Sequence, residues 1–317
     1  LYTFAALTAG ITANLNAGTV EKTVSSGTIT DTITSIENII GSDFDDTFIT
    51  KLTTVNIIDG GESNINVQGA EVSGDTVDYS SNGATKIVVD LSDIVDNYST
   101  VTVSGTSAAN DKLKDIENIT GTAGNDTITA NASVNGLQGG AGKDTLSGGD
   151  GKDIINGYYT DQSESSVEYD TVSYSYLTSK AVTIDLTAGT AVVDSNDSDT
   201  LISIENAIGG SLADIITGSA DINSLEGGAG NDTFISSLGN DYIYGGNVTG
   251  ITHTDSQTTG DMADYSNSIN SSNNLVVNLS TTSSDAAGNS YSSAYVRLSS
   301  NNSSVYTDSL YGIEDIT

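Results

Sequence analysis

The chain of 317 residues contains 9 basic and 42 acidic residues, which gives it a formal net charge of −33. This balance excludes the clustered Lys and Arg side chains that nucleic acid and anionic membranes require. We therefore expect no nucleic-acid binding. No apolar run of about 20 residues is present to cross a bilayer, so we also expect no membrane insertion.

The first part of the chain is expected to hold a strand, a short acidic motif and a degenerate repeat. Residues 11–15 alternate apolar and polar side chains, as a half-buried strand does. An I-E-N motif centred on Glu37 follows, and four residues later the nine-residue frame GSDFDDTFI begins, with Asp46 in its sixth position. The sixth position of the next frame is Val55, so we expect at most one cation site in residues 41–66.

The second part contains the clearest repeat of the chain. A D-x-V-x-Y-S stretch at residues 75–80 and an alternating strand at residues 87–91 lead to a second I-E-N motif at Glu117. Residues 121–156 then form consecutive nine-residue frames, GTAGNDTIT, ANASVNGLQ, GGAGKDTLS and GGDGKDIIN. In each frame the sixth position is Asp or Asn and the eighth is aliphatic. This period is too short for a helical hairpin and indicates a turn followed by a short strand.

The same succession recurs toward the C-terminus. D-x-[VA]-x-Y-S stretches occupy residues 170–175 and 261–266, alternating strands follow at 182–186 and 275–279, and I-E-[ND] motifs centre on Glu205 and Glu314. Residues 209–244 repeat the nine-residue frame, again with one Asn, Asn223, in a sixth position. The polar connections at residues 158–168, 194–199, 246–260 and 280–293 are expected to be surface loops that carry unit-specific function.

These landmarks predict superrepeat units of about 90 residues. The predicted boundaries are 1–74, with degenerate nonapeptides in 41–66; 75–169, with a block at 121–156; 170–260, with a block at 209–246; and 261–317. The last unit stops where another nonapeptide block would begin, so we expect the parent protein to continue.

Stacking of the frames predicts a cation. Two frames make one coil of about 18 residues, and frames two apart then stack at about 4.8 Å, which places Asp126 over Asp144 and Asp214 over Asp232. Two carboxylates about 5 Å apart repel by roughly 3 kcal/mol at an effective dielectric of about 20, and a shared divalent ion would reverse that cost. Oxygen-only ligands favour calcium. We therefore predict an all-β fold, an elongated, right-handed parallel β-roll or β-helix solenoid stapled by calcium.

The frames GGAGKDTLS, GGDGKDIIN and GGAGNDTFI resemble the G-G-x-G-x-D-x-U-x repeat of the repeat-in-toxin (RTX) family, and GTAGNDTIT and SSLGNDYIY match it in part. The resemblance implies that sixth-position Asp side chains and the carbonyls of the glycine turns hold several Ca²⁺ ions. The implied ligands are Asp46, Asp126, Asp144, Asp153, Asp214, Asp232 and Asp241, with Gly139, Gly140, Ala141, Gly142, Gly148, Gly149, Asp150, Gly151, Gly227, Gly228, Ala229 and Gly230.

Candidate catalytic residues are scarce. His253 is the only histidine, and its polar surroundings predict a solvated loop residue. The glutamates of the I-E-[ND] motifs offer carboxylates for glycoside chemistry, but a residue repeated once per unit is better explained as a structural cap or a support for calcium. We expect no enzymatic activity.

Three functions are compatible with the sequence. The first is a structural segment of a secreted bacterial surface protein, similar to RTX-type proteins of surface layers (S-layers), extracellular fibres and large adhesins, which implies export by type I secretion. The second is a calcium-dependent folding or secretion module of an enzyme encoded elsewhere in the parent chain. The third is a carbohydrate-binding module that uses exposed tyrosines, among them Tyr158, Tyr159, Tyr174 and Tyr176.

Short nonapeptide blocks set into superrepeats favour the first function. We expect an extracellular chain at the bacterial cell surface, folding where calcium is millimolar, although an acidic halophile surface would also explain the charge. The expected partners are other copies of the chain or neighbouring repeats of its parent, and a surface polysaccharide.

Overall fold

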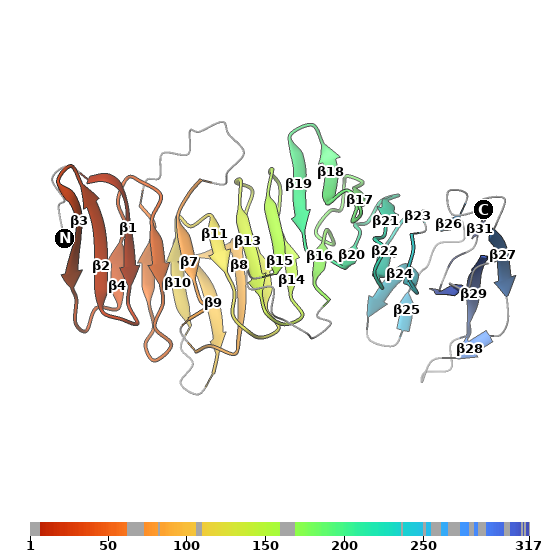
Figure 1. The fold of residues 1–317 in the computed structure, drawn as a ribbon, viewed down its shortest axis with the longest axis horizontal. Coiled ribbons are helices and arrows are strands. Elements are labelled where there is room, and N and C mark those ends of the chain that lie inside the picture. The colour runs from red at the N-terminus through yellow and green to blue at the C-terminus, as the bar shows by residue number, and fades with distance from the viewer. Residues whose placement is uncertain are drawn as a thin grey trace. The chain divides into compact units, whose positions relative to one another are not determined.

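The described part of the computed structural model consists of strands, turns and loops, without a helix, and the chain divides into two compact units, Leu1–Asp170 and Thr171–Thr317 (Figure 1). The structure describes residues 7–61, 73–81, 83–105, 110–158, 169–235, 237–249, 252–254, 261–265, 273–278, 282–284, 290–300, 305–311, 313 and 315–316. Nothing in these ranges qualifies as a membrane-spanning helix. The division into four superrepeats stays a prediction.

The first unit contains two sheets that the chain visits alternately. One sheet has the order β3 (Gly27–Thr32), β2 (Thr19–Val24), β1 (Leu7–Asn14), β5 (Thr47–Ile49), β7 (Thr76–Asp78), β11 (Asn118–Thr120), β13 (Gly136–Gly140), β15 (Ile154–Tyr158). The other has the order β14 (Thr145–Ser147), β12 (Thr127–Thr129), β8 (Lys86–Val95), β9 (Tyr98–Ser104), β10 (Asp111–Lys114), β6 (Ile57–Asp59), β4 (Asn38–Ile40). A full coil consists of a strand in one sheet, a turn, a strand in the other sheet and a second turn.

The core of this unit is formed by the apolar residue at the centre of most of the short strands. In the first sheet Ile119 of β11 is paired with Leu137 of β13, and Leu137 with Ile155 of β15. In the second sheet Ile128 of β12 is paired with Leu146 of β14. All of these side chains are buried. Parallel pairing in register therefore stacks the eighth positions of the nonapeptide frames into continuous apolar rows, and the parallel β-roll predicted from the sequence is present.

Antiparallel meanders interrupt the parallel sheets, which the nonapeptide pattern does not predict. Strands β1, β2 and β3 form one meander in the first sheet, and β8, β9 and β10 form another in the second sheet. The turn between β8 and β9 contains Asp96 and Asn97 with φ of 54° and 69°. Positive φ at both central residues is the condition of a type I′ hairpin turn, so the chain reverses there instead of entering another coil.

The second unit repeats this plan. One sheet has the order β19 (Asp197–Ile202), β18 (Thr190–Asp194), β17 (Thr183–Asp185), β21 (Ile215–Thr217), β23 (Thr233–Ile235), β26 (Met262–Asp264), β31 (Asp315–Ile316). The other has the order β16 (Thr171–Ser173), β20 (Asn206–Ile208), β22 (Ser224–Gly228), β24 (Tyr242–Thr249), β30 (Val305–Tyr311), β29 (Ser290–Ser300), β27 (Asn273–Asn278), with β25 (Thr252–Thr254) on β24 and β28 (Thr282–Ser284) on β29. The meanders are β17–β18–β19 and β30–β29–β27.

Several predicted surface loops are wrong in part. Within the predicted loop 194–199 only residues 195–196 form a turn, because Asp194 ends β18 and residues 197–199 belong to β19; β25 and β28 lie within the predicted loops 246–260 and 280–293. His253 is accordingly a strand residue, paired with Val248 of β24. Short polar strands lack the apolar alternation that marks a buried strand, and this is why composition alone assigned them to loops. Most of residues 158–168 lies outside the described residues.

The three I-E-[ND] motifs that lie wholly within the described residues, at Glu37, Glu117 and Glu205, share a backbone feature. The residue two positions before the glutamate has a left-handed φ in Ser35 (56°), Asp115 (51°) and Ser203 (50°). The carboxylate of Glu117 accepts the backbone N–H of Asp75 at 2.9 Å. This glutamate therefore caps the neighbouring coil, as expected of a residue that recurs once in each unit.

Candidate metal centre

Rows of buried carboxylates lie where the turns enter the strands. Asp126, Asp144 and Asp153 immediately precede β12, β14 and β15, respectively. Every acidic side chain predicted from the nonapeptide frame is exposed to 2 % or less: Asp46, Asp126, Asp144, Asp153, Asp214, Asp232 and Asp241. The frame therefore places these side chains inside the turns and not on a solvated surface.

Backbone donors hold these carboxylates to the neighbouring coil. The N–H of Asp126 donates to Oδ1 of Asp144, 18 residues later, at 2.7 Å. The corresponding bonds are Asp214 to Asp232 (2.8 Å), Asn135 to Asp153 (2.8 Å), Asn223 to Asp241 (3.0 Å), Ile87 to Asp126 (2.6 Å), Val182 to Asp214 (2.7 Å) and Ile11 to Asp46 (2.6 Å). Carboxylates two frames apart are thus brought together in rows, as the stacking of the frames predicts.

The first glycine of a full frame is required by its own aspartate. A Cβ on Gly139 would lie 2.3 Å from Oδ2 of Asp144, and a Cβ on Gly148 would lie 2.2 Å from Oδ2 of Asp153. A Cβ on Gly227 would meet the side chain of Asp232 in the same way, at 2.3 Å. Any other residue at these positions would displace the carboxylate from its row.

The second and fourth glycines allow the turns of successive coils to approach closely. Their φ values are left-handed: Gly140 112°, Gly142 118°, Gly149 86°, Gly151 142°, Gly228 102° and Gly230 130°. A Cβ on Gly140 would lie 2.1 Å from the carbonyl oxygen of Thr122. The other predicted turn residues lie on the same turns, where Ala141 and Ala229 donate their N–H groups to the previous coil and the side chain of Asp150 is exposed.

Burial makes the charged form of these groups costly. Loss of solvent raises the pKa of Asp46, Asp126 and Asp214 above the usual value, and it raises the pKa of Asp241 to about 7. Carboxylates stacked about 4.8 Å apart repel by roughly 3 kcal/mol at an effective dielectric of about 20. A bound cation would relieve both costs.

The available donors fit calcium. No group of three or more His, Cys, Asp or Glu side chains converges on one point within the described ranges. A cation in a row would therefore be held by pairs of carboxylates together with backbone carbonyls of the glycine turns. Calcium accepts this mixture of carboxylate and carbonyl oxygens in flexible geometry. The Asp residues of the rows and the turns that begin at Gly139, Gly148 and Gly227 are the groups that would hold it.

At two sixth positions the frame has asparagine in place of aspartate, and there the side-chain amide hydrogen-bonds to a backbone carbonyl, so that no cation is needed. Nδ2 of Asn135 donates to the carbonyl oxygen of Glu117 at 2.7 Å, and Nδ2 of Asn223 donates to that of Glu205 at 2.7 Å. An aspartate has no donor to offer a carbonyl. The two Asn positions are therefore neutral links between the I-E-[ND] motif and the Asp rows.

Sequence reasoning missed the aspartates that begin the D-x-[VA]-x-Y-S stretches. Oδ1 of Asp75, Asp170 and Asp261 accepts the N–H of an aspartate in the preceding coil at 2.7 Å in each case. These residues therefore extend the rows beyond the nonapeptide blocks. The signal was present, because an Asp two residues before a buried aliphatic side chain has the spacing of positions six and eight.

The tyrosines of the D-x-[VA]-x-Y-S stretches are buried, and each hydrogen-bonds to an aspartate. Tyr79, Tyr174 and Tyr265 are fully buried, and their hydroxyls donate to Asp111 (3.2 Å), Asp199 (2.6 Å) and Asp308 (2.8 Å). The reading of Tyr174 as part of an exposed sugar platform is therefore wrong. Tyr176 is half-buried with its ring 6.2 Å from that of Tyr174, whereas the side chain of Tyr158 and all of Tyr159 lie outside the described residues.

The degenerate first block follows a different register from the one predicted. Asn56, and not Val55, occupies the sixth-position place, because the turn that begins at Thr50 is one residue longer than a nonapeptide turn. Asn56 is buried and donates its N–H to Asp111 at 2.8 Å, whereas Val55 is 45 % exposed.

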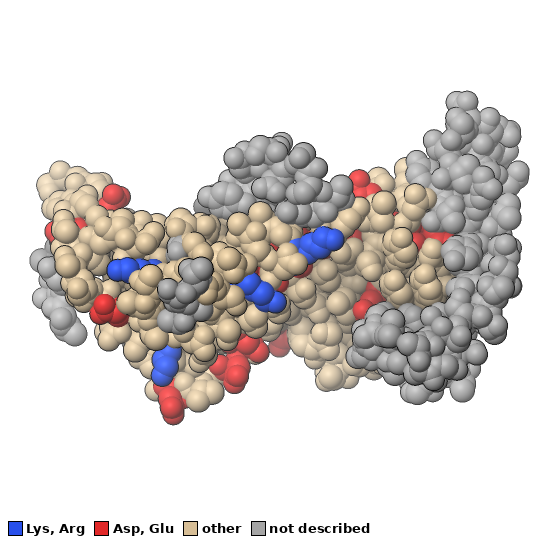
Figure 2. Space-filling model, turned by 90° about the horizontal axis from the view of Figure 1, so that it is seen from below, with Lys and Arg blue, Asp and Glu red and all other residues tan. Residues whose placement is uncertain are grey.

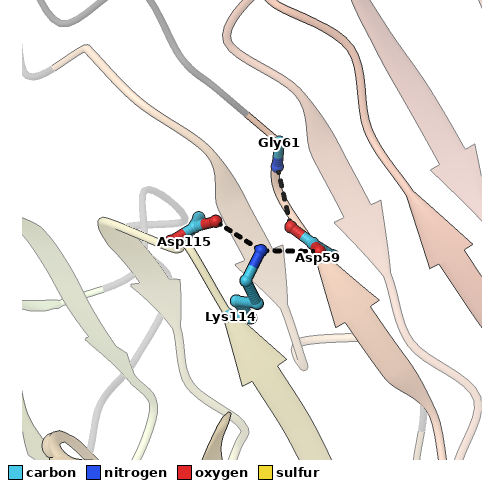
Figure 3. A network of polar contacts seen from close by, with 4 residues as sticks. All are labelled: Asp59, Gly61, Lys114 and Asp115. Atoms are coloured by element: carbon cyan, nitrogen blue, oxygen red, sulfur yellow. Dashed lines mark hydrogen bonds and ion pairs between the residues drawn. The ribbon is translucent and has the colours of Figure 1, made fainter. Parts of the chain in front are cut away.

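Lys114 on β10 links two acidic side chains near this block (Figure 3). Its Nζ lies 2.8 Å from Oδ2 of Asp59 on the paired strand β6 and 2.8 Å from Oδ2 of Asp115. Hydrogen bonds to Asp115 and Asp59 raise the pKa of Lys114. A partly exposed network of this kind contributes modestly to stability, and here it reinforces the register between β6 and β10.

The fold is a parallel β-roll in which buried carboxylate rows lie beside glycine turns. In agreement, residues 115–135, 135–158 and 208–243 match the model of the RTX calcium-binding nonapeptide repeat (4 copies). The chain therefore carries RTX repeats, which are calcium-binding motifs, over about a quarter of its length. No curated protein matches the chain.

Proposed function

We propose that this chain is a calcium-binding structural segment of a secreted bacterial cell-surface protein, of the kind that forms surface layers, extracellular fibres or large adhesins. The observation that carries the proposal is the alternation of short nonapeptide blocks with three-stranded antiparallel meanders. An uninterrupted tandem array would suffice for calcium-dependent folding alone. Meanders inserted at intervals add lateral surface to the roll, which suits a protein that is built to make contacts.

We assign no enzymatic activity to this segment. His253 lies on a short strand, and the recurring glutamates include Glu117, which serves as a backbone cap. The buried carboxylates are held by backbone donors inside the turns, where they are not presented to a substrate. These observations favour a structural role.

The alternative function is a calcium-dependent folding or secretion module of an enzyme encoded elsewhere in the parent chain. The buried Asp rows favour it as well, because carboxylates that need a cation couple folding to the calcium outside the cell. The carbohydrate-binding alternative is weaker, since the buried ring of Tyr174 cannot present a platform to a sugar.

The proposed partners are other copies of the chain, neighbouring repeats of the parent protein and a surface polysaccharide. On the face shown in Figure 2, the basic side chains lie apart from one another and do not gather into a patch. This arrangement and the net charge of −33 speak against nucleic acid or an anionic membrane as a partner. We place the segment outside the cell, at the bacterial surface.

Light scattering across a calcium titration tests the proposal. A surface-layer or fibre segment should form end-to-end or lateral assemblies at millimolar calcium and return to monomers when calcium is chelated. A monodisperse monomer at every calcium concentration would favour the folding-module alternative instead.

A further inference from the structure

Residues 60–61 and 74–75 reproduce the two ends of a nonapeptide turn, although residues 62–73 separate them in the sequence. A Cβ on Gly60 would lie 2.3 Å from Oδ2 of Asp75, the distance found between Gly139 and Asp144. Gly61 has a φ of 105°, close to the 112° of Gly140 in the second position of that frame. The turn therefore has the shape of a full repeat with a segment inserted into it.

The neighbouring coil supplies the second half of the same arrangement. A Cβ on Gly41 would lie 2.1 Å from the carbonyl oxygen of Gly60 and 2.2 Å from Oδ2 of Asp46. The corresponding distances from Gly121 are 2.1 Å to the carbonyl oxygen of Gly139 and 2.6 Å to Oδ2 of Asp126. Each glycine thus meets the same pair of oxygens, one from its own frame and one from the next coil.

The two carboxylates are also linked as in the RTX rows. The N–H of Asp46 donates to Oδ1 of Asp75 at 2.7 Å, which is the distance of the bond from Asp126 to Asp144. Asp46 and Asp75 are both buried, at 1 % and 0 % exposure. The pair is therefore placed as two successive ligands of a cation row.

One oxygen of this pair lacks a donor. Within the residues that the structure describes, the buried Oδ2 of Asp75 receives no hydrogen bond. Burial first, and then the nearby charges of Asp46, Glu117 and Asp45, raise the pKa of Asp75 to about 7. A buried acceptor without a donor costs about 1–3 kcal/mol, which a cation at this oxygen would offset.

We propose that Asp46 and Asp75, with backbone carbonyls of residues 41–46 and 60–61, bind a calcium-type divalent cation at this interrupted turn. The inference rests on the proposed calcium-dependent function and adds a site outside the residues that match the RTX repeat. Because Gly60 and Asp75 stand at the two ends of the inserted segment, the bound ion fastens both ends to the same coil. An insertion at such a turn is then compatible with an unbroken cation row.

Calorimetric titration of the whole chain with calcium tests this site. Asp75→Asn keeps an oxygen for the N–H of Asp46 and places an amide where the second carboxylate oxygen stands, so it should bind at least one calcium ion fewer than the wild type. Gly60→Ala, which drives a methyl group against Asp75, should lose the same ion while the charge is unchanged. The control Asp93→Asn removes a charge at an exposed position of β8, outside the site, and should bind as many ions as the wild type.

Circular dichroism in saturating calcium establishes that each variant is folded, which the intact rows in residues 121–156 and 209–244 should ensure. Equal stoichiometry and affinity in the wild type, Asp75→Asn and Gly60→Ala would overturn the site and leave the proposed function standing. A wild-type chain that binds no calcium would overturn both.

Discussion

Replacing Asp241 by Asn should have opposite effects on stability with and without calcium. Asp241 is buried, its Oδ1 accepts the N–H of Asn223 at 3.0 Å, and its Oδ2 accepts the hydroxyl of Ser237 at 3.1 Å. An asparagine keeps the first bond through its oxygen, and the hydroxyl of Ser237 can rotate to accept from its amide. The substitution therefore removes a charge and changes little else.

The size of the effect follows from the pKa of Asp241. Burial first, and then the charge of Asp308, raise this pKa from 3.8 to about 7. One pKa unit corresponds to about 1.4 kcal/mol, so the charged form costs on the order of 4 kcal/mol at pH 7 when no cation is bound. Relaxation and water penetration reduce such penalties, and we expect the free energy of unfolding in chelator to rise by about 1–3 kcal/mol. In calcium the variant lacks a ligand and should lose about 1.4 kcal/mol for each tenfold loss of affinity.

Urea denaturation followed by far-UV circular dichroism, in chelator and in millimolar calcium, measures both effects. The control Asp221→Asn makes the same change of charge at an exposed position of the neighbouring turn and should alter neither value by more than about 0.5 kcal/mol. A loss of stability in chelator as well as in calcium would refute the reasoning, because it would mean that the carboxylate serves only as a hydrogen-bond acceptor.

Three further predictions concern the pH dependence of stability, the hydroxyl of Tyr174 and the side-chain amide of Asn135. The pKa values of Asp111 and Asp241 are raised in the folded state, to about 6 and about 7, so the folded chain binds protons more tightly than the unfolded chain. The free energy of unfolding in chelator should therefore fall as the pH rises from 3.8 to about 7, which urea denaturation across this range measures. Tyr174→Phe removes the hydroxyl that donates to the buried Asp199 at 2.6 Å and should cost about 1–3 kcal/mol in the same assay. Asn135→Asp replaces an amide that donates to a backbone carbonyl by a carboxylate, so it should destabilise the chelated chain and raise the calcium concentration needed for folding.

Matched variants separate these effects from general damage. Tyr242→Phe removes a hydroxyl from a ring that is 47 % exposed and should leave stability unchanged, while Asn125→Asp adds a charge at an exposed turn position. Stability in chelator that is constant or rises over the acidic range would contradict the pH prediction. A Tyr174→Phe variant as stable as the wild type, or an Asn135→Asp variant with the calcium requirement of Asn125→Asp, would contradict the other two.

The nonapeptide blocks could be predicted from the sequence because their structure is set by a local period. A turn and a short strand fit into nine residues, so the register that buries Ile128 and Leu146 also stacks Asp126 on Asp144. Parallel pairing of frames two apart follows without knowledge of any distant contact. The all-β fold, the apolar rows and the carboxylate rows all rest on this one period.

The parts that interrupt the period could not be predicted in the same way. Gly60 and Asp75 belong to one turn, but a search for contiguous frames does not join them across residues 62–73. The meanders depend on antiparallel pairing between β8, β9 and β10, which hydrophobic alternation does not distinguish from parallel pairing. Asn56 was missed because the turn before it has one residue more than a nonapeptide turn. The added residue shifts the nine-residue sequence frame by one, although Asn56 still occupies the buried sixth-position place in the structure.

The central claim is that calcium neutralises the buried Asp rows and thereby folds the chain. Far-UV circular dichroism of the whole chain, first in chelator at pH 7.5 or above and then during titration to millimolar calcium, tests it most directly. The account predicts a disordered spectrum that converts to a β spectrum as calcium is added and reverts when chelator is restored. A chelated chain with the same β spectrum and the same resistance to urea as the calcium-loaded chain would contradict it.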